Sequence, residues 1–138
     1  MQAAVRAGLV AAKAGEADRF LAMVAAADDA IKAREQAPEV QKILKTVPGY
    51  VPGLMVSAFL QDLQKNYEAE ARLLEQVLSS YPFFAPATRN LALLYFEQLG
   101  DDKKANELAS KARRSFPDDA SLARALGILA YRRGYYLQ

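Results

Sequence analysis

Between its prolines, the chain places apolar and polar residues in a pattern that predicts pairs of helices, each pair divided by a short break. Each predicted helix is about a dozen residues long, the usual length in globular proteins. The predicted helices span Leu54–Lys65, Tyr67–Ser80, Thr88–Leu99, Lys103–Phe116 and Leu122–Arg133. The pattern therefore indicates consecutive helix-turn-helix units.

The breaks inside these units contain Asn66, Gly100 and Gly134. Glycine and asparagine tolerate the left-handed conformation that closes many helices, and aspartates such as Asp101 cap the helix that follows. We therefore expect one helix to end and the next to begin at each of these three positions.

Proline marks the boundaries between units. Pro82 and Pro117 are expected to end the helices before them, because a proline disfavours helical geometry at the preceding residue. Pro52 and Pro86 suit the first turn of the next helix. The segment from Pro48 recurs from Pro82, 34 residues later, and Pro117 follows after 35 more. This spacing predicts an internal repeat.

The residues within this period resemble the tetratricopeptide repeat family, whose unit is a helix-turn-helix of 34 residues with small or apolar residues at fixed places. One unit carries Leu91, Ala92, Tyr95, Ala105, Ala112 and Pro117, with one extra residue around Gly100. The unit before it carries Ala58, Tyr67, Leu74, Val77 and Pro82, but has Glu70 where the family prefers a small residue. The last, partial unit carries Leu126, Gly127, Ala130, Gly134 and Tyr136. The resemblance covers about residues 51–136.

This resemblance implies an all-α fold, a right-handed superhelix (α-solenoid) of antiparallel helix pairs. We expect a single domain that contains repeats at 51–82 and 85–117 and a partial repeat at 120–138. Upstream, spacing alone suggests a leading helix within 1–15 (Gln2–Lys13) and a degenerate repeat at 17–48. The helices of that repeat are expected at Ala17–Arg34 and Glu39–Val47.

In this family the first helix of each unit lines the concave face, at the fifth, ninth, twelfth and thirteenth places. The implied groove residues are Met55, Phe59, Asp62, Leu63, Arg89, Leu93, Phe96, Glu97, Arg124, Ile128, Tyr131 and Arg132. Several are apolar or aromatic where a solvated face would be polar, which suggests a groove for a peptide or a helix. The alternative is that a neighbouring helix of a longer parent protein covers these residues.

Composition excludes most catalytic chemistry. The 138 residues include no Cys and no His, so thiolate nucleophiles, imidazole bases and the usual zinc or haem ligands are missing. We read Asp101-Asp102 and Asp118-Asp119 as helix caps and Asp28-Asp29 as a solvated helix face, since adjacent carboxylates lack the staggered ligands of a calcium loop. We therefore expect no enzymatic activity, no metal and no cofactor.

Charge and hydropathy limit the partners. A formal net charge of +2 is too small for a dedicated nucleic-acid binder, and basic residues at helix ends, such as Arg113 and Arg132, indicate at most a preference for an acidic partner. No apolar run is long enough for membrane insertion, so we expect a soluble chain, cytoplasmic or periplasmic. The expected partner is a protein or a peptide.

The last repeat is incomplete at the C-terminus, where a second helix is expected to begin after Gly134. The apolar residues near this end are Leu126, Leu129, Tyr135 and Tyr136. They suggest either an artificial boundary or an open end that forms a homodimer. The sequence thus favours a non-catalytic interaction scaffold. One alternative is a scaffold domain cut from a larger enzyme or from an envelope transport or secretion assembly. The other is a self-association module.

Overall fold

The computed structural model describes residues 15–137, and within them the chain is all-helical. Seven α-helices and one π-helical turn are present in this range. A first helix over residues 15–26 is followed by α2 (Ala30–Thr46), α3 (Val51–Leu63), α4 (Tyr67–Ser80), α5 (Ala85–Leu94), the π-helical turn η1 (Tyr95–Leu99), α6 (Asp102–Ser115) and α7 (Ala120–Leu137). The predicted all-α class is confirmed. The helix expected at Gln2–Lys13 lies outside the described residues.

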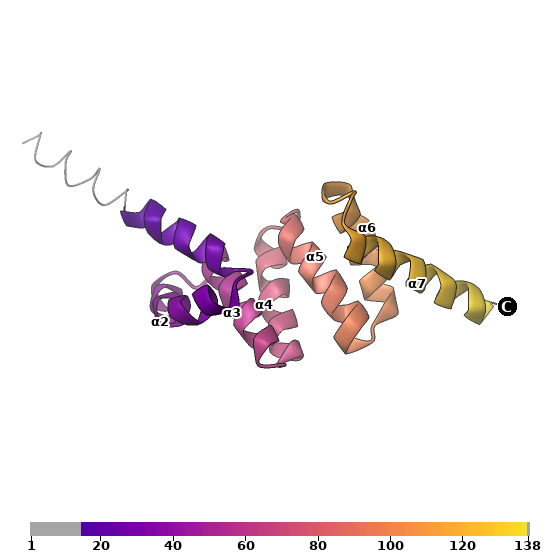
Figure 1. Cartoon of the computed structure of the whole chain (residues 1–138), viewed down its shortest axis with the longest axis horizontal. Coiled ribbons are helices and arrows are strands. Elements are labelled where there is room, and N and C mark those ends of the chain that lie inside the picture. Colours follow the sequence, from indigo (N-terminus) through magenta and orange to yellow (C-terminus); the bar gives the residue numbers. More distant parts are fainter. Residues whose placement is uncertain (1–14, 138) are drawn as a thin grey trace, which may run out of the picture.

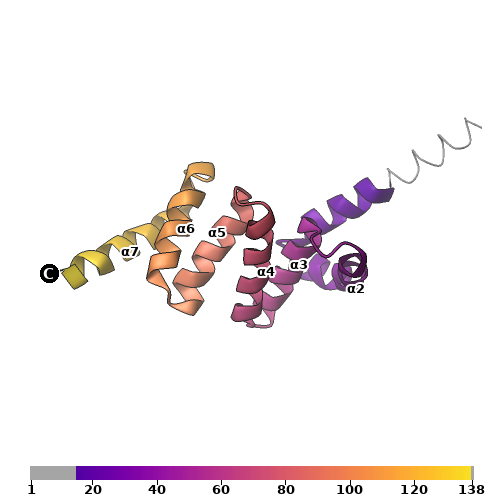
Figure 2. The same cartoon turned by 180° about the vertical axis from the view of Figure 1, so that it is seen from behind.

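The helices pack mainly against their neighbours in the sequence, with adjacent helices antiparallel. Figures 1 and 2 show α2 to α7 following one another along the longest axis in chain order, with the C-terminal half of α7 projecting beyond α6. Short connections favour this arrangement, because a few residues suffice to join two antiparallel helices that lie side by side.

The apolar faces form three clusters. One joins the helix at 15–26 to α2 and α3 through Met23, Val40 and Val56. The largest runs from α3 to α7 around the fully buried Leu74, and the third joins α5, α6 and α7 around Leu122. Because each cluster shares helices with the next, the core continues along the array.

The predicted roles of the prolines are confirmed. Pro52 and Pro86 lie in the first turns of α3 and α5, where a missing N–H leaves no intrahelical hydrogen bond unmade. These helices begin about three residues before the predicted starts. The helices before Pro82 and Pro117 end at Ser80 and Ser115.

The upstream boundaries were predicted wrongly. A single helix at Ala17–Arg34 does not form, because the first helix ends at residue 26 and Asp29 caps a new one. One carboxylate oxygen of Asp29 accepts hydrogen bonds from the amides of Ile31 and Lys32, at 3.0 and 3.1 Å. Asp29 is therefore a cap and does not lie within a helix. Helix α2 then continues through Pro38, so the separate helix predicted at Glu39–Val47 is part of α2.

The C-terminal break was also predicted wrongly. Helix α7 continues through Gly134 to Leu137, so no second helix begins there. Glycine inside a helix costs only about 1 kcal/mol relative to alanine, and neither a proline nor an Asp or Asn cap follows it. At the first break the left-handed residue is Lys65, with φ of 61°, and not Asn66.

The extra residue predicted around Gly100 lies in η1. A π-helical turn arises when one residue is inserted into an α-helix, and here it ends at Gly100, whose φ of 68° is left-handed. The amides of Gly100 and Asp101 both donate to the carbonyl of Tyr95. The π-helical turn thus contains the extra residue of the 35-residue spacing. The Asp101 side chain then caps α6 by accepting a hydrogen bond from the Lys104 amide at 3.1 Å.

Candidate functional site

Two adjoining cavities lie where the first helix of the described chain meets α3 and α5. The first has a volume of about 280 Å³ and is lined mainly by α3, α5 and η1, with one residue from α4 and two from the turn before α2. Six of the twelve predicted groove residues line it: Met55, Phe59, Asp62, Arg89, Leu93 and Glu97. The fold therefore brings half of the predicted groove residues together in one cavity.

Glu70 is the residue of the first cavity with the most unusual environment. It lies on α4 and is only 8% exposed, and its buried Oε2 atom has no hydrogen-bond partner. Burial raises the pKa of Glu70 from 4.5 to about 8. The nearby Asp62 carboxylate adds to the rise through its charge and as the acceptor of a hydrogen bond from protonated Glu70. At neutral pH, Glu70 is therefore largely protonated beside Asp62.

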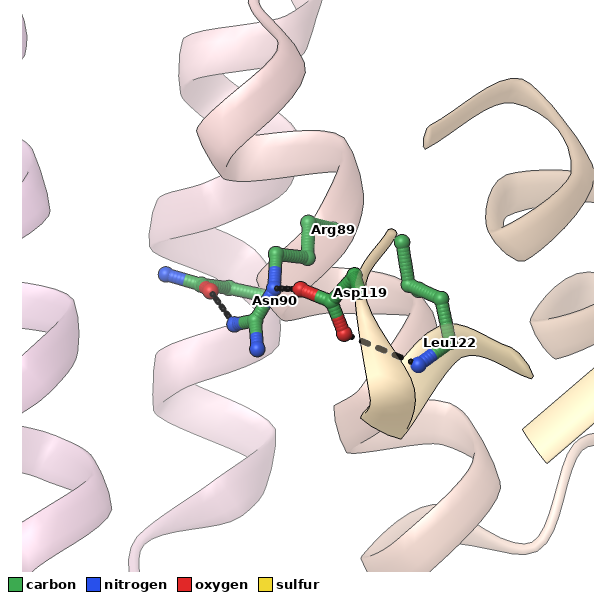
Figure 3. A network of polar contacts seen from close by, with 4 residues as sticks. All are labelled: Arg89, Asn90, Asp119 and Leu122. Atoms are coloured by element: carbon green, nitrogen blue, oxygen red, sulfur yellow. Dashed lines mark hydrogen bonds and ion pairs between the residues drawn. The ribbon is translucent and has the colours of Figure 1, made fainter. Parts of the chain in front are cut away.

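The one cation among the described residues that line this cavity is already paired. Arg89 donates from Nε to Asp119 Oδ2 at 2.5 Å and from a terminal nitrogen to Asn90 Oδ1 at 3.2 Å (Figure 3). Asp119 also caps α7 by accepting from the Leu122 amide at 3.0 Å. The hydrogen bond from Arg89 holds the pKa of Asp119 below its usual range. Arg89 thus ties α5 to the start of α7, and its charge is balanced there.

The second cavity is larger and mainly apolar. It has a volume of about 620 Å³ and shares Ala27, Asp28, Met55 and Asn90 with the first. Its remaining lining residues are Phe20, Val24, Val51, Pro52, Tyr81, Phe84 and Pro86. Phe20, Val24 and Tyr81 are each about half exposed, so these large apolar side chains face an open hollow. We call the two cavities together the α3–α5 groove.

The other six predicted groove residues lie outside the first cavity. Arg132 stacks over the ring of Phe96, 5.4 Å from its centroid, and pairs with Asp102 at 3.1 Å. Leu63 is half-buried at the end of α3, and Arg124, Ile128 and Tyr131 lie on α7. Helix α7 therefore carries a separate part of the predicted surface.

The expected self-association patch is only partly exposed. Leu129 is buried in the core, which contradicts its expected place in an open apolar end, and Leu126 is half-buried against the cluster around Leu122. Tyr135 is 69% exposed. The side chain of Tyr136 lies outside the described part of the chain.

The acidic pairs behave largely as capping residues. Asp101 and Asp119 each accept from a backbone amide at the start of a helix, as predicted. Across residues 15–137, no three acidic, His or Cys side chains are grouped so that they would hold a metal ion. In the same range, no helix is both long and apolar enough to cross a membrane.

Sequence reasoning missed several residues of the α3–α5 groove. Glu70 was noted only as a departure from the repeat pattern, although an acidic residue at a position that favours small side chains indicates burial. Phe20 and Val24 lie one helical turn apart, a spacing that places both on one face. Tyr81 follows α4 directly, and its position in the hollow depends on the packing of α4 and α5.

Comparison with protein-family models and with curated proteins gave no significant match. The fold therefore defines only a broad class, an all-helical domain with seven helices in the described residues 15–137 and antiparallel packing of neighbours.

Proposed function

We propose that the chain is a non-catalytic protein–protein interaction module that binds a peptide or a helix of a partner in the α3–α5 groove. The observation that carries the proposal is the apolar second cavity, where Phe20, Val24 and Tyr81 remain about half exposed. Large apolar side chains that gather around one hollow are typical of a protein-binding surface.

We also propose that the helix pairs are tetratricopeptide-like repeats stacked in a right-handed superhelix. The 34-residue spacing, the prolines in the first turns of α3 and α5, and the antiparallel packing of neighbours support this arrangement. In such a stack the first helices of the units line one face, and both α3 and α5 contribute to the groove. The same architecture suits the scaffold domain of a larger assembly.

Selection of binders from a displayed library of random peptides, followed by affinity measurement on synthetic copies, tests the interaction role. Phe20→Ser should weaken binding roughly tenfold or more, since truncating an aromatic anchor typically costs about 2 kcal/mol. Phe83→Ser is the matched control, because Phe83 is 97% exposed and does not line either cavity.

Peptides that bind the wild type and the control equally but lose affinity for Phe20→Ser would support the proposal. Failure to select any peptide, or equal binding to all three proteins, would reject the groove as the binding surface.

A further inference from the structure

The first cavity is acidic, and one of its acids has a buried carboxyl oxygen without a hydrogen-bond partner. Asp28, Asp62, Glu70 and Glu97 line it, and Arg89, the cation among them, is paired with Asp119 outside the cavity. Glu70 lies more than nine-tenths buried, with Oε2 unpartnered. A buried oxygen without a hydrogen bond is costly in native proteins, and a bound donor would remove that cost.

The chemistry of such a donor is limited by its surroundings. The charges that face Glu70 come from Asp62 on α3, Arg89 on α5, Glu97 on η1 and Asp28 before α2. Three of these four are acidic, so an anion is repelled. Met55, Phe59 and Leu93 supply apolar walls, which suit the methylene stem of a long cationic side chain.

We propose that the first cavity receives the lysine or arginine side chain of a bound protein segment, whose neighbouring apolar side chain occupies the second cavity. This inference rests on the proposed interaction role and names the chemistry of the partner. The continuity of the two cavities through Met55 and Asn90 favours a polypeptide over a free amine, because one segment fills both hollows.

Entry of the cationic side chain changes the protonation of Glu70. Unoccupied, Glu70 holds a proton near neutral pH and offers it to Asp62. When the cationic head enters and donates to Glu70 Oε2, the carboxyl loses that proton to the solvent. Binding is then accompanied by the release of up to one proton, and it strengthens as the pH rises toward 8.

Peptides selected on the wild-type chain test the inference. We expect a Lys or Arg close to an apolar residue in the selected sequences. Replacing that basic residue with Gln should weaken binding roughly tenfold or more, and Glu70→Gln should weaken it similarly. The control Glu68→Gln, on the exposed face of the same helix, should leave affinity unchanged. Asp62→Asn provides a second variant that keeps Glu70.

Peptides that bind in the groove without a basic residue, or whose affinity is unchanged by Glu70→Gln and Asp62→Asn, would overturn the inference and leave the interaction role intact. If no peptide is selected, n-butylammonium serves as the probe, and carbon NMR follows the pH titration of the Glu70 carboxyl in its presence. The expected result is a lower titration midpoint than in tetramethylammonium at equal ionic strength, because only the former donates a hydrogen bond. Equal midpoints would reject the cation site.

Discussion

The buried carboxyl of Glu70 should make the stability of the fold fall as the pH rises through the neutral range. Its pKa is raised from 4.5 to about 8, so between these values the folded chain holds one proton more than the unfolded chain. The free energy of unfolding then decreases by about 1.4 kcal/mol per pH unit for this group. The stability that protonated Glu70 supplies is complete below about pH 4.5 and is lost as the pH rises to about 8.

The magnitude follows from that difference in pKa. Over the whole interval the loss approaches about 5 kcal/mol, and between about pH 5 and about pH 8 it is about 3 to 4 kcal/mol. Glutamine has nearly the shape of a protonated glutamate and does not ionise. Glu70→Gln should therefore match the wild type near pH 5 and exceed it by about 3 kcal/mol near pH 8.

Urea denaturation of the full chain at a series of pH values measures this effect directly. The control Glu68→Gln makes the same replacement at an exposed position of α4 and should follow the wild-type curve. Parallel curves for Glu70→Gln and the wild type across this range would refute the assignment of Glu70 as a buried, protonated acid.

Three further substitutions test the local structure by thermal or chemical denaturation. Gly100→Ala should cost about 1 kcal/mol because Gly100 has a φ of 68°, and no loss would argue against the left-handed end of η1. Lys65→Gly should be neutral or should stabilise the fold by up to about 1 kcal/mol, because Lys65 has a φ of 61°. The control Lys45→Gly, in the last turn of α2, should destabilise the fold by about 1 kcal/mol. Loss of stability in both variants would contradict the assigned conformations. Tyr95→Phe should cost about 1 kcal/mol, because the Tyr95 hydroxyl donates a hydrogen bond to the Glu75 carboxylate. In a Glu75→Ala background, which has no acceptor, that loss should be absent, and an undiminished loss in this double-mutant cycle would contradict the pair.

The fold was predictable where local signals were strong. The prolines, the glycine at position 100 and the aspartates at 101 and 119 determine the helix ends by effects confined to a few residues, and these predictions were confirmed. Asp29 and Gly134 were misread because each permits two outcomes. Asp29 is a cap only if the helix before it ends, and Gly134 breaks a helix only if a cap or a proline follows it.

The site was less predictable than the fold. The family resemblance implied that Met55, Phe59 and Leu93 share one face, and all three line the first cavity. The apolar second cavity depends on how the helix at 15–26 approaches α3 and α5, which no local signal specifies. The burial of Glu70 likewise depends on tertiary packing, since residues of α3, α5 and η1 line the cavity that it enters.

The central claim is that the α3–α5 groove binds a protein segment, and its most direct test is the footprint of a selected peptide on the chain by two-dimensional NMR. The claim predicts that saturation with peptide shifts the signals of Phe20, Met55 and Leu93 and leaves those of exposed α6 residues such as Lys111 unchanged. Shifts confined to α7, around Ile128 and Tyr131, with the groove signals unchanged, would contradict it.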